Sequence, residues 1–366
     1  NQENDCRRFT RLASKRKAEK ESRPQNGSDE KKKMRRVVLG DIQNTIITSP
    51  IVGKDGDGEK PRRRPNCSRK KSREAHSPES DDPKRSSSID EPQICEEYAS
   101  DIYEYLHKME MEASRRPLPD YLKKIQTDVT ANMRGILIDW LVEVSEEYKL
   151  QSDTLYLTVS YIDLYLSKNT VNRQKLQLLG VSSMLIASKY EEITPPHVED
   201  FCYITDNTYT KKDVVQMESD MLVSLGFQMG NPTVKTFLRR LNLVSLKDEE
   251  SCNSQLELLG SYLSELSLLD YQCVKFLPSM VAASVVFLSR FTIHPEQHPW
   301  NEILQQQSGY KASELRECVS IIHDLQLSRR AGGLVAIRDK YKHHKMEFVS
   351  TLVSLPVIPV AFFDDL

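Results

Sequence analysis

The segment from Met133 to Tyr148 is apolar on almost every side of a helix, and this limits the folds open to the chain. One stripe recurs at the helical period of about 3.6 residues, formed by Met133, Ile136, Leu137, Trp140, Leu141, Val144 and Tyr148. Ile138 and Val142 fall on the opposite side. A helix that is apolar all round is stable only where other elements surround it. The sequence therefore predicts a helix over 132–148 in the middle of a bundle.

The same periodicity continues after residue 94, and strand alternation is almost absent. Start signals support three helices: Asn172 precedes one, Thr210 with Asp213 resembles a capping box, and Asn231-Pro232 would begin another. The fold class predicted is all-α. Further helices are expected at about 153–168, 173–190, 197–204, 210–226, 232–242, 251–270, 277–291, 300–307 and 311–328.

An internal repeat divides these helices into two groups. Five residues recur at an offset of 101, so that Tyr209, Asp213, Val214, Met217 and Met221 align with Tyr310, Glu314, Leu315, Cys318 and Ile322. Small-residue helices repeat at nearly the same interval. We predict two tandem five-helix units. The expected divisions of the chain are 1–93, 94–130 (an N-terminal helix and linker), 131–229, 230–330 and 331–366 (a C-terminal helix and tail).

The nearly neutral net charge of −2 hides a strong asymmetry. Residues 1–93 carry 24 Lys+Arg against 16 Asp+Glu, a net of +8, which leaves −10 for 94–366. Phe9 is the only aromatic residue before position 94. A segment so poor in large apolar groups cannot offset the entropy cost of ordering its backbone. We expect residues 1–93 to be a disordered basic tail.

Several classes of protein are disfavoured. The seven Cys are scattered without a CxxC pair, which argues against a disulfide framework or a structural zinc site and favours a reducing compartment. No apolar run reaches the roughly 18 residues of a membrane span, so we expect no membrane association. Pro295 and Pro299 follow His294 and His298, so no helix could present this pair to a metal. No phosphate loop, dinucleotide fingerprint or GxSxG occurs, and we expect no cofactor.

Several motifs resemble those of a known protein family. Residues 133–144, MRGILIDWLVEV, look like the opening helix of the cyclin box, and KLQLLG at 175–180 with ASKYEEI at 187–193 resembles its third helix in A- and B-type cyclins. The endings LVAIRDKY and PVAFF are similar to the third subgroup of plant A-type cyclins. The resemblance covers about 94–330 and implies two tandem cyclin boxes. Gly135 stands where animal A-type cyclins usually have Ala, so we expect a close neighbour there.

The family resemblance implies a regulatory subunit, not an enzyme, that binds and activates a cyclin-dependent kinase in S phase or at G2–M. Lys189 and Glu218 would hydrogen-bond the backbone around a mobile kinase helix. Read from the residues alone, the two would be only an exposed ion pair. Tyr190 replaces the more usual Phe. The resemblance assigns an apolar surface to Ile186, Tyr190 and Phe227, extended by Tyr98 and Ile102 from a preceding helix.

A second predicted surface would capture Arg-x-Leu segments of substrates and inhibitors. By resemblance, apolar side chains would hold the Leu and an acidic residue would meet the Arg. A stripe of Met, Leu and Trp at helical spacing is also typical of an ordinary hydrophobic core, and some of these residues must serve both as core and as docking surface. The residues that match the family's docking patch are Met133, Ile136, Leu137, Trp140, Glu143, Leu176 and Gln177.

The basic tail contains RVVLGDIQN at 36–44, which fits the destruction-box pattern of mitotic cyclins through Arg36, Leu39, Ile42 and Asn44. A ubiquitin ligase would bind this segment as an extended peptide. Clusters of Lys and Arg at 15–17, 31–33, 62–64 and 69–71 resemble nuclear-import signals, so we expect a nuclear protein with a cytoplasmic pool. Specific nucleic-acid binding is disfavoured because the tail has one aromatic residue for stacking.

Two alternatives remain open from the residues. A general transcription factor can share the two-box helical fold, but it should carry a basic folded region for DNA, whereas 94–366 has a net charge of −10. A helical enzyme would need ionisable groups converging in a pocket, and the sequence assembles none.

Overall fold

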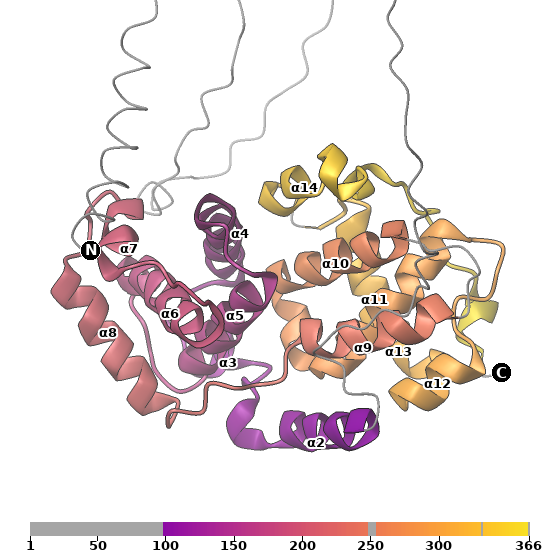
Figure 1. Cartoon of the computed structure of the whole chain (residues 1–366), viewed down its shortest axis with the longest axis horizontal. Helices are drawn as coiled ribbons and strands as arrows, with labels where there is room; N and C mark the ends of the chain where they lie inside the picture. The colour runs from indigo at the N-terminus through magenta and orange to yellow at the C-terminus, as the bar shows by residue number, and fades with distance from the viewer. Residues whose placement is uncertain (1–97, 248–253, 331, 365–366) are drawn as a thin grey trace, which may run out of the picture. The chain divides into compact units, whose positions relative to one another are not determined.

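The structure, a computed structural model, describes residues 98–247, 254–330 and 332–364 (Figure 1). These residues form helices and connecting loops with no strand among them, which confirms the predicted all-α fold. Residues 1–97, which include the predicted destruction box and the basic clusters, lie outside the described residues. None of the described helices has the length and apolar character needed to cross a membrane.

The first box consists of five helices, and α6 is its central helix. α6 packs against α4, α5 and α8, and every side chain from Leu176 to Ser188 is buried. α7 packs on both α6 and α8. The five helices are α4 (Ala131–Tyr148), α5 (Ser152–Leu166), α6 (Leu176–Glu191), α7 (Val198–Ile204) and α8 (Lys211–Ser224).

The second box repeats this plan with α11 at its centre. α11 packs against α9, α10 and α13, and its small side chains Ala282 and Ala283 are fully buried, which lets these neighbours approach closely. The five helices are α9 (Val234–Lys247), α10 (Ser254–Leu269), α11 (Pro278–Ile293), α12 (Glu302–Ser308) and α13 (Ala312–Gln326).

Equivalent helices of the two boxes begin in the same way. In α8 the amide of Thr210 donates to the Asp213 carboxylate at 2.9 Å, and in α13 the amide of Lys311 donates to the Glu314 carboxylate at 2.8 Å. An acidic side chain in the first turn thus satisfies a backbone donor at the same position of each repeat. The hydrogen bonds explain why Asp213 and Glu314 recur in the sequence.

The start of α9 differs from the prediction. Pro232 does not enter the helix, which begins at Val234, because the amide of Thr233 donates to the hydroxyl of Thr236 at 3.2 Å. Asn231, expected to cap the helix, instead accepts a hydrogen bond from the Arg115 guanidinium at 3.0 Å. Its side chain therefore ties the connection between the boxes to the segment that follows α2 (Ala99–Met111).

α4 lies where the two boxes meet. It packs against α5 and α6 of its own box, against α10 of the second box, and against α14 (Ala336–Lys340) near the C-terminus. These neighbours from two boxes explain why α4 is apolar on almost every side. The prediction that 132–148 is helical is confirmed, but the middle of the first box is α6.

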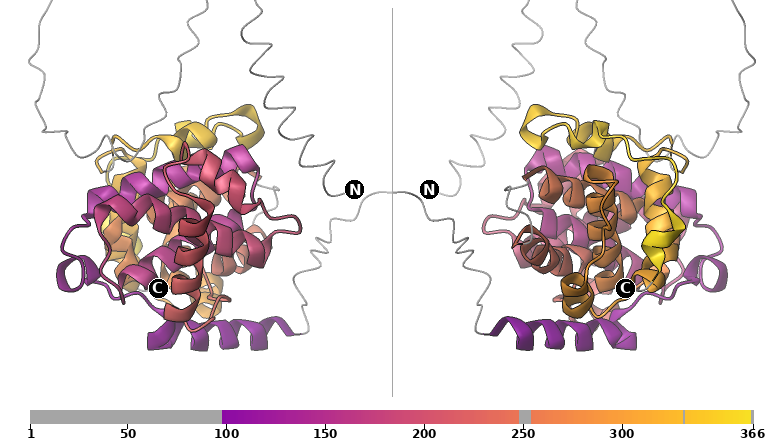
Figure 2. Two further views of the ribbon diagram at one scale, coloured as in Figure 1. Left: turned by 90° about the vertical axis from the view of Figure 1, so that its left-hand side faces the viewer. Right: turned by 90° about the vertical axis from the view of Figure 1, so that its right-hand side faces the viewer.

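Two segments outside the boxes lie on opposite sides of the molecule (Figures 1 and 2). At the end of α2, the carboxylate of Glu110 accepts hydrogen bonds from the amide and hydroxyl of Ser279, at the start of α11. On the other side, the ammonium of Lys340 in α14 lies 2.9 Å from Glu265 of α10 and 3.3 Å from Glu146 of α4. α2 is therefore fixed to the second box, and α14 bridges both.

Gly135 has the close neighbour that the sequence predicts. A Cβ at this position would lie 3.1 Å from Cδ1 of Leu334, in the segment leading to α14, and 3.4 Å from the carbonyl oxygen of Leu269. Glycine lets the C-terminal segment pack directly on the α4 backbone.

Candidate functional site

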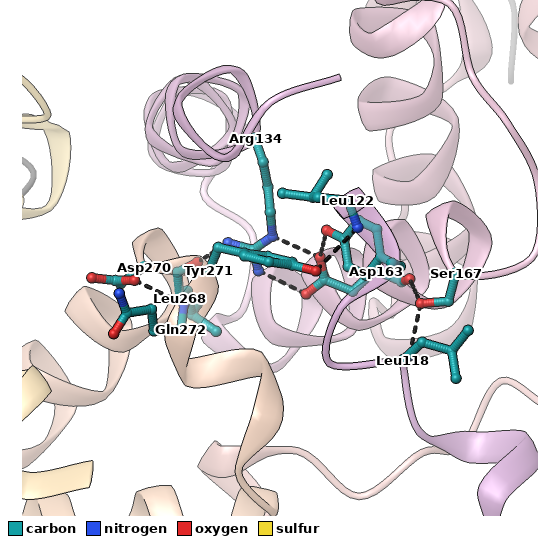
Figure 3. Close-up of polar contacts among 10 residues, drawn as sticks. Leu118, Leu122, Arg134, Asp163, Ser167, Leu268, Asp270, Tyr271 and Gln272 are labelled. Carbon is teal, nitrogen blue, oxygen red and sulfur yellow. Dashed lines mark hydrogen bonds and ion pairs between the residues drawn. The ribbon is translucent and has the colours of Figure 1, made fainter. Parts of the chain in front are cut away.

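A buried ion pair joins α4 and α5 of the first box to α10 of the second (Figure 3). The Arg134 guanidinium donates to both carboxylate oxygens of Asp163 at 2.7 Å and to the carbonyl oxygen of Leu268 in the second box at 2.8 Å. The hydroxyl of Tyr121 donates to the same carboxylate at 2.8 Å. Burial opposes the charge of Arg134, but the charge and hydrogen bonds of Asp163 raise its pKa above the ordinary value. α4, α5 and α10 are thus locked together.

Lys189 and Glu218, predicted from the family resemblance, face each other across the packed pair α6 and α8. The Lys189 ammonium lies 2.5 Å from the Glu218 carboxylate. Lys189 occupies the last turn of α6, where a cation is favourable because it opposes the helix dipole. The Lys189 side chain is 47% exposed and that of Glu218 12%, so the pair lies at the protein surface.

Large apolar side chains are exposed at the adjoining helix ends. Tyr190 follows Lys189 and is 55% exposed, Phe227 follows α8 and is 68% exposed, and Ile193 is 99% exposed. Ile193 was not among the predicted residues, although a β-branched apolar residue directly after Glu191-Glu192 is a signal that could have identified it. Exposed apolar groups near an ion pair are typical of a surface that a partner covers.

One predicted member of this apolar surface is buried. Ile186 is only 4% exposed, because it lies one turn earlier on α6, where α5 and α8 cover the helix. The assignment of Ile186 to the accessible surface is corrected: it supports the end of α6 from within the core.

The backbone after α8 turns sharply to present Phe227. Gly226 and Phe227 both have left-handed φ, at +61° and +58°. The amide of Phe227 donates to the carbonyl of Leu222 at 3.0 Å, and that of Gly226 to Val223 at 3.1 Å, which together close the helix C-terminus. A left-handed residue other than glycine costs roughly 1–2 kcal/mol, so the hydrogen bonds that close the helix end must hold the Phe227 backbone in place.

The remaining predicted residues of the first surface lie on α2 and directly before it. Tyr98 and Ile102 are exposed, as is Tyr105, which the sequence analysis did not select. The three follow one face at spacings of four and three residues, so helical periodicity could have identified Tyr105. Glu110 holds this helix in position through Ser279.

The predicted docking patch is divided by depth. Met133, Ile136 and Trp140 are half-buried, and Glu143 is exposed. Leu137, Leu176 and Gln177 are buried between α4 and α6, so their assignment to an accessible surface is corrected to a supporting one. Partial burial raises the pKa of Glu143, and the charge of Asp339 in α14 adds to this shift. The C-terminal segment thus lies beside the patch.

Among the described residues, no three His, Cys, Asp or Glu side chains converge as metal ligands. Cys202, Cys273 and Cys318 are free thiols in the interior. Burial raises the pKa of Cys318 to about 12, so this thiol is protonated at neutral pH.

Comparisons with known proteins agree with the two-box arrangement. The family model described as Cyclin, N-terminal domain matches residues 101–230, and that described as Cyclin, C-terminal domain matches residues 232–355. Cyclin-A3-4 of Arabidopsis thaliana is 53% identical over 364 residues, covering 99% of this chain and 97% of that relative. Cyclin-A3-1 of Oryza sativa subsp. japonica is 62% identical over 276 residues, covering 75% of this chain and 74% of the relative.

A solved structure gives the same result in three dimensions. A viral cyclin from herpesvirus saimiri superposes with a TM-score of 0.55 at 25% identity, covering 61% of this chain and 96% of that chain. Two family matches, near full-length plant relatives and a shared two-box fold place this chain in the cyclin family, among the plant A3-type cyclins.

Proposed function

We propose that this cyclin binds a cyclin-dependent kinase and activates it, and that it has no catalytic activity of its own. The observation that carries the proposal is the Lys189–Glu218 pair at the edge of an exposed apolar surface. Such a surface is unfavourable in water and becomes favourable when a partner covers it.

The pair retains polar groups for a partner. An ammonium has three donors, of which one binds Glu218 in the described part of the chain, and a carboxylate can accept on both oxygens. These groups match the free amides and carbonyls at the ends of a partner helix. Tyr190, Ile193 and Phe227 would cover the apolar side of the same helix.

Activation would follow from binding a mobile element in one position. A protein kinase is active only when a helix glutamate pairs with a strand lysine. A rigid surface that contacts the inward position of that helix more favourably than the outward one shifts the equilibrium toward the active state. The buried Arg134–Asp163 pair and the bridging Lys340 give the cyclin this rigidity.

The other parts of the proposal concern substrates and turnover. Arg-x-Leu segments of substrates and inhibitors would bind to Met133, Ile136, Trp140 and Glu143, while the kinase is bound at its own surface.

The tail would be recognised by a ubiquitin ligase through Arg36 and Leu39, and its basic clusters would direct the protein to the nucleus. We place its activity in S phase or at G2–M, consistent with a relative named G2/mitotic-specific cyclin C13-1 in Daucus carota, which is 54% identical over 331 residues.

Size-exclusion chromatography with a purified cyclin-dependent kinase tests the proposal. We expect the two proteins to elute together and histone phosphorylation to rise on mixing. Separate elution with unchanged kinase activity would contradict it, and DNA retention by the folded region would favour a transcription-factor module instead.

A further inference from the structure

The loop between α8 and α9 is held on both sides of Gly230. On one side, the carbonyl of Met229 accepts a hydrogen bond from the hydroxyl of Tyr161 in α5 at 2.7 Å. On the other, Asn231 accepts one from Arg115 at 3.0 Å. These two contacts restrict movement of the Gly230 backbone.

Tyr190 lies directly against this glycine. A Cβ built on Gly230 would lie 2.6 Å from the Tyr190 hydroxyl oxygen and 3.6 Å from its ring carbon Cζ. The shorter distance is closer than real Cβ atoms approach a neighbour. An alanine at position 230 therefore cannot coexist with Tyr190 where its ring now lies.

The backbone of Gly230 does not itself require glycine. Its φ lies outside the left-handed region, unlike that of Gly226 at +61°. An alanine is compatible with such a conformation and normally stabilises a chain slightly, because it reduces the freedom of the unfolded state. The Tyr190 hydroxyl is thus the obstacle to a side chain at position 230.

We propose that Gly230 is a positioning residue for Tyr190, and that the two act as a coupled pair that sets the shape of the partner-binding surface. This proposal rests on the proposed function. Because Tyr190 is half exposed and the loop is tied down, a side chain at position 230 would displace the ring instead of the backbone. The ring would then move away from position 230, and the apolar surface to which it belongs would change shape.

The pair also bears on specificity. A phenylalanine at position 190 would lack the hydroxyl and leave room for alanine at 230. A tyrosine at 190 requires glycine at 230, because its hydroxyl occupies the space of the missing Cβ. The expected partner presents an apolar recess for this ring and for Phe227, as one end of a helix with its adjoining loop would.

Four proteins test the proposal: the wild type, Gly230→Ala, Tyr190→Phe and the double variant. Kinase affinity is measured for each by calorimetry, with thermal unfolding as the measure of folding. We expect Gly230→Ala to weaken binding by about tenfold, equivalent to about 1.4 kcal/mol, with little change in melting temperature. The double variant should bind as tightly as Tyr190→Phe alone, because without the hydroxyl the ring carbon Cζ lies 3.6 Å from the added Cβ, an ordinary contact.

Rescue by Tyr190→Phe distinguishes positioning from a general structural effect. The matched control is Gly333→Ala, since a Cβ at Gly333 meets no atom within 4 Å. If Gly230→Ala is itself poorly folded, the double variant still decides, because removing the hydroxyl must restore both folding and binding. Wild-type binding by Gly230→Ala, or a double variant as weak as Gly230→Ala, would overturn the proposal. Failure of the wild type to bind any kinase would instead overturn the proposed function.

Discussion

The guanidinium of Arg134 binds both carboxylate oxygens of Asp163 at 2.7 Å within the first box, while it also donates to the carbonyl of Leu268 in the second. Both side chains are almost completely buried. This charged group therefore links α4 to α10, in addition to the direct packing of the two helices and the Lys340 bridge. Any surface that spans elements of both boxes relies on these links.

Arg134→Met should lower the free energy of unfolding by about 3–5 kcal/mol, because Asp163 would be left as an uncompensated buried charge. Urea unfolding at neutral pH measures the loss. The matched control is Arg173→Met, which removes the exposed pair with Asp128 and should cost less than about 1 kcal/mol. Equal losses for the two variants would contradict the structural importance of the buried pair.

Asp139 makes stability depend on pH. Burial raises its pKa from 3.8 to about 6, although the amides of Ala336 and Val335 donate to its carboxylate and oppose the shift. Since the folded pKa exceeds the unfolded one, the folded state holds the proton more tightly. This contribution to stability is complete below about pH 4 and disappears as the pH rises through 6.

The variant Asp139→Asn removes this titration. The free energy of unfolding of this variant, relative to that of the wild type, should rise by about 1–2 kcal/mol between pH 4 and pH 7. This is less than the full pKa shift would give, because the side chain retains contact with solvent. Urea unfolding of both proteins across this range measures the difference. A difference that stays constant with pH would show that Asp139 does not titrate there.

The docking patch predicts a separation of two activities. Met133→Ala with Glu143→Ala should weaken binding of a fluorescent Arg-x-Leu peptide by about tenfold or more, because one change removes apolar contact and the other the acidic partner of the arginine. Phosphorylation of a short peptide without the motif should not change. Glu147→Ala, exposed on the same helix, is the control. Unchanged peptide affinity in the double variant would place the docking surface elsewhere.

The tail predicts a change in lifetime. Replacing Arg36 and Leu39 with Ala should stabilise the protein through mitotic exit, because the ubiquitin ligase would lose both anchors of the nine-residue motif. The half-life is measured after synthesis is blocked in synchronised cells. The control replaces Arg62 and Arg63 with Ala, which removes two positive charges from the tail instead of one. Decay at the wild-type rate in the Arg36, Leu39 variant would exclude this motif as the signal.

Helical periodicity predicted the helices, because burial leaves a direct pattern in the sequence, and the internal repeat predicted their division into two groups. Periodicity could not predict that α4 lies between the boxes, since an all-round apolar pattern shows that a helix is covered but not by which elements. Likewise, the motif that contains Gln177 and the motif that directly follows Ile186 indicate helices but not the depth of a side chain within the fold, and both side chains are buried.

Two glycines show where prediction from sequence stops. Gly135 within a helix indicates a close approach, because glycine is otherwise unfavourable there. The identity of the neighbour, Leu334, depends on how the C-terminal segment returns to α4. Gly230 lies in a loop, where glycine is common, and only the position of the Tyr190 hydroxyl reveals that it is needed.

The most direct measurement exchanges the charges of the central pair. In the double variant Lys189→Glu with Glu218→Lys, the two side chains can still form an ion pair with each other. If the pair served only to link α6 to α8 within the cyclin, kinase binding would therefore not change. A pair that contacts a kinase would present each group to the wrong backbone partner. The control exchanges Lys211 and Glu199, another exposed pair at 2.6 Å.

Kinase affinity and melting temperature are measured for both exchanges. We predict that the exchange at 189 and 218 leaves the melting temperature near that of the wild type but weakens kinase binding by about a hundredfold, while the exchange at 211 and 199 leaves binding unchanged. Wild-type affinity in the 189 and 218 exchange would contradict the account.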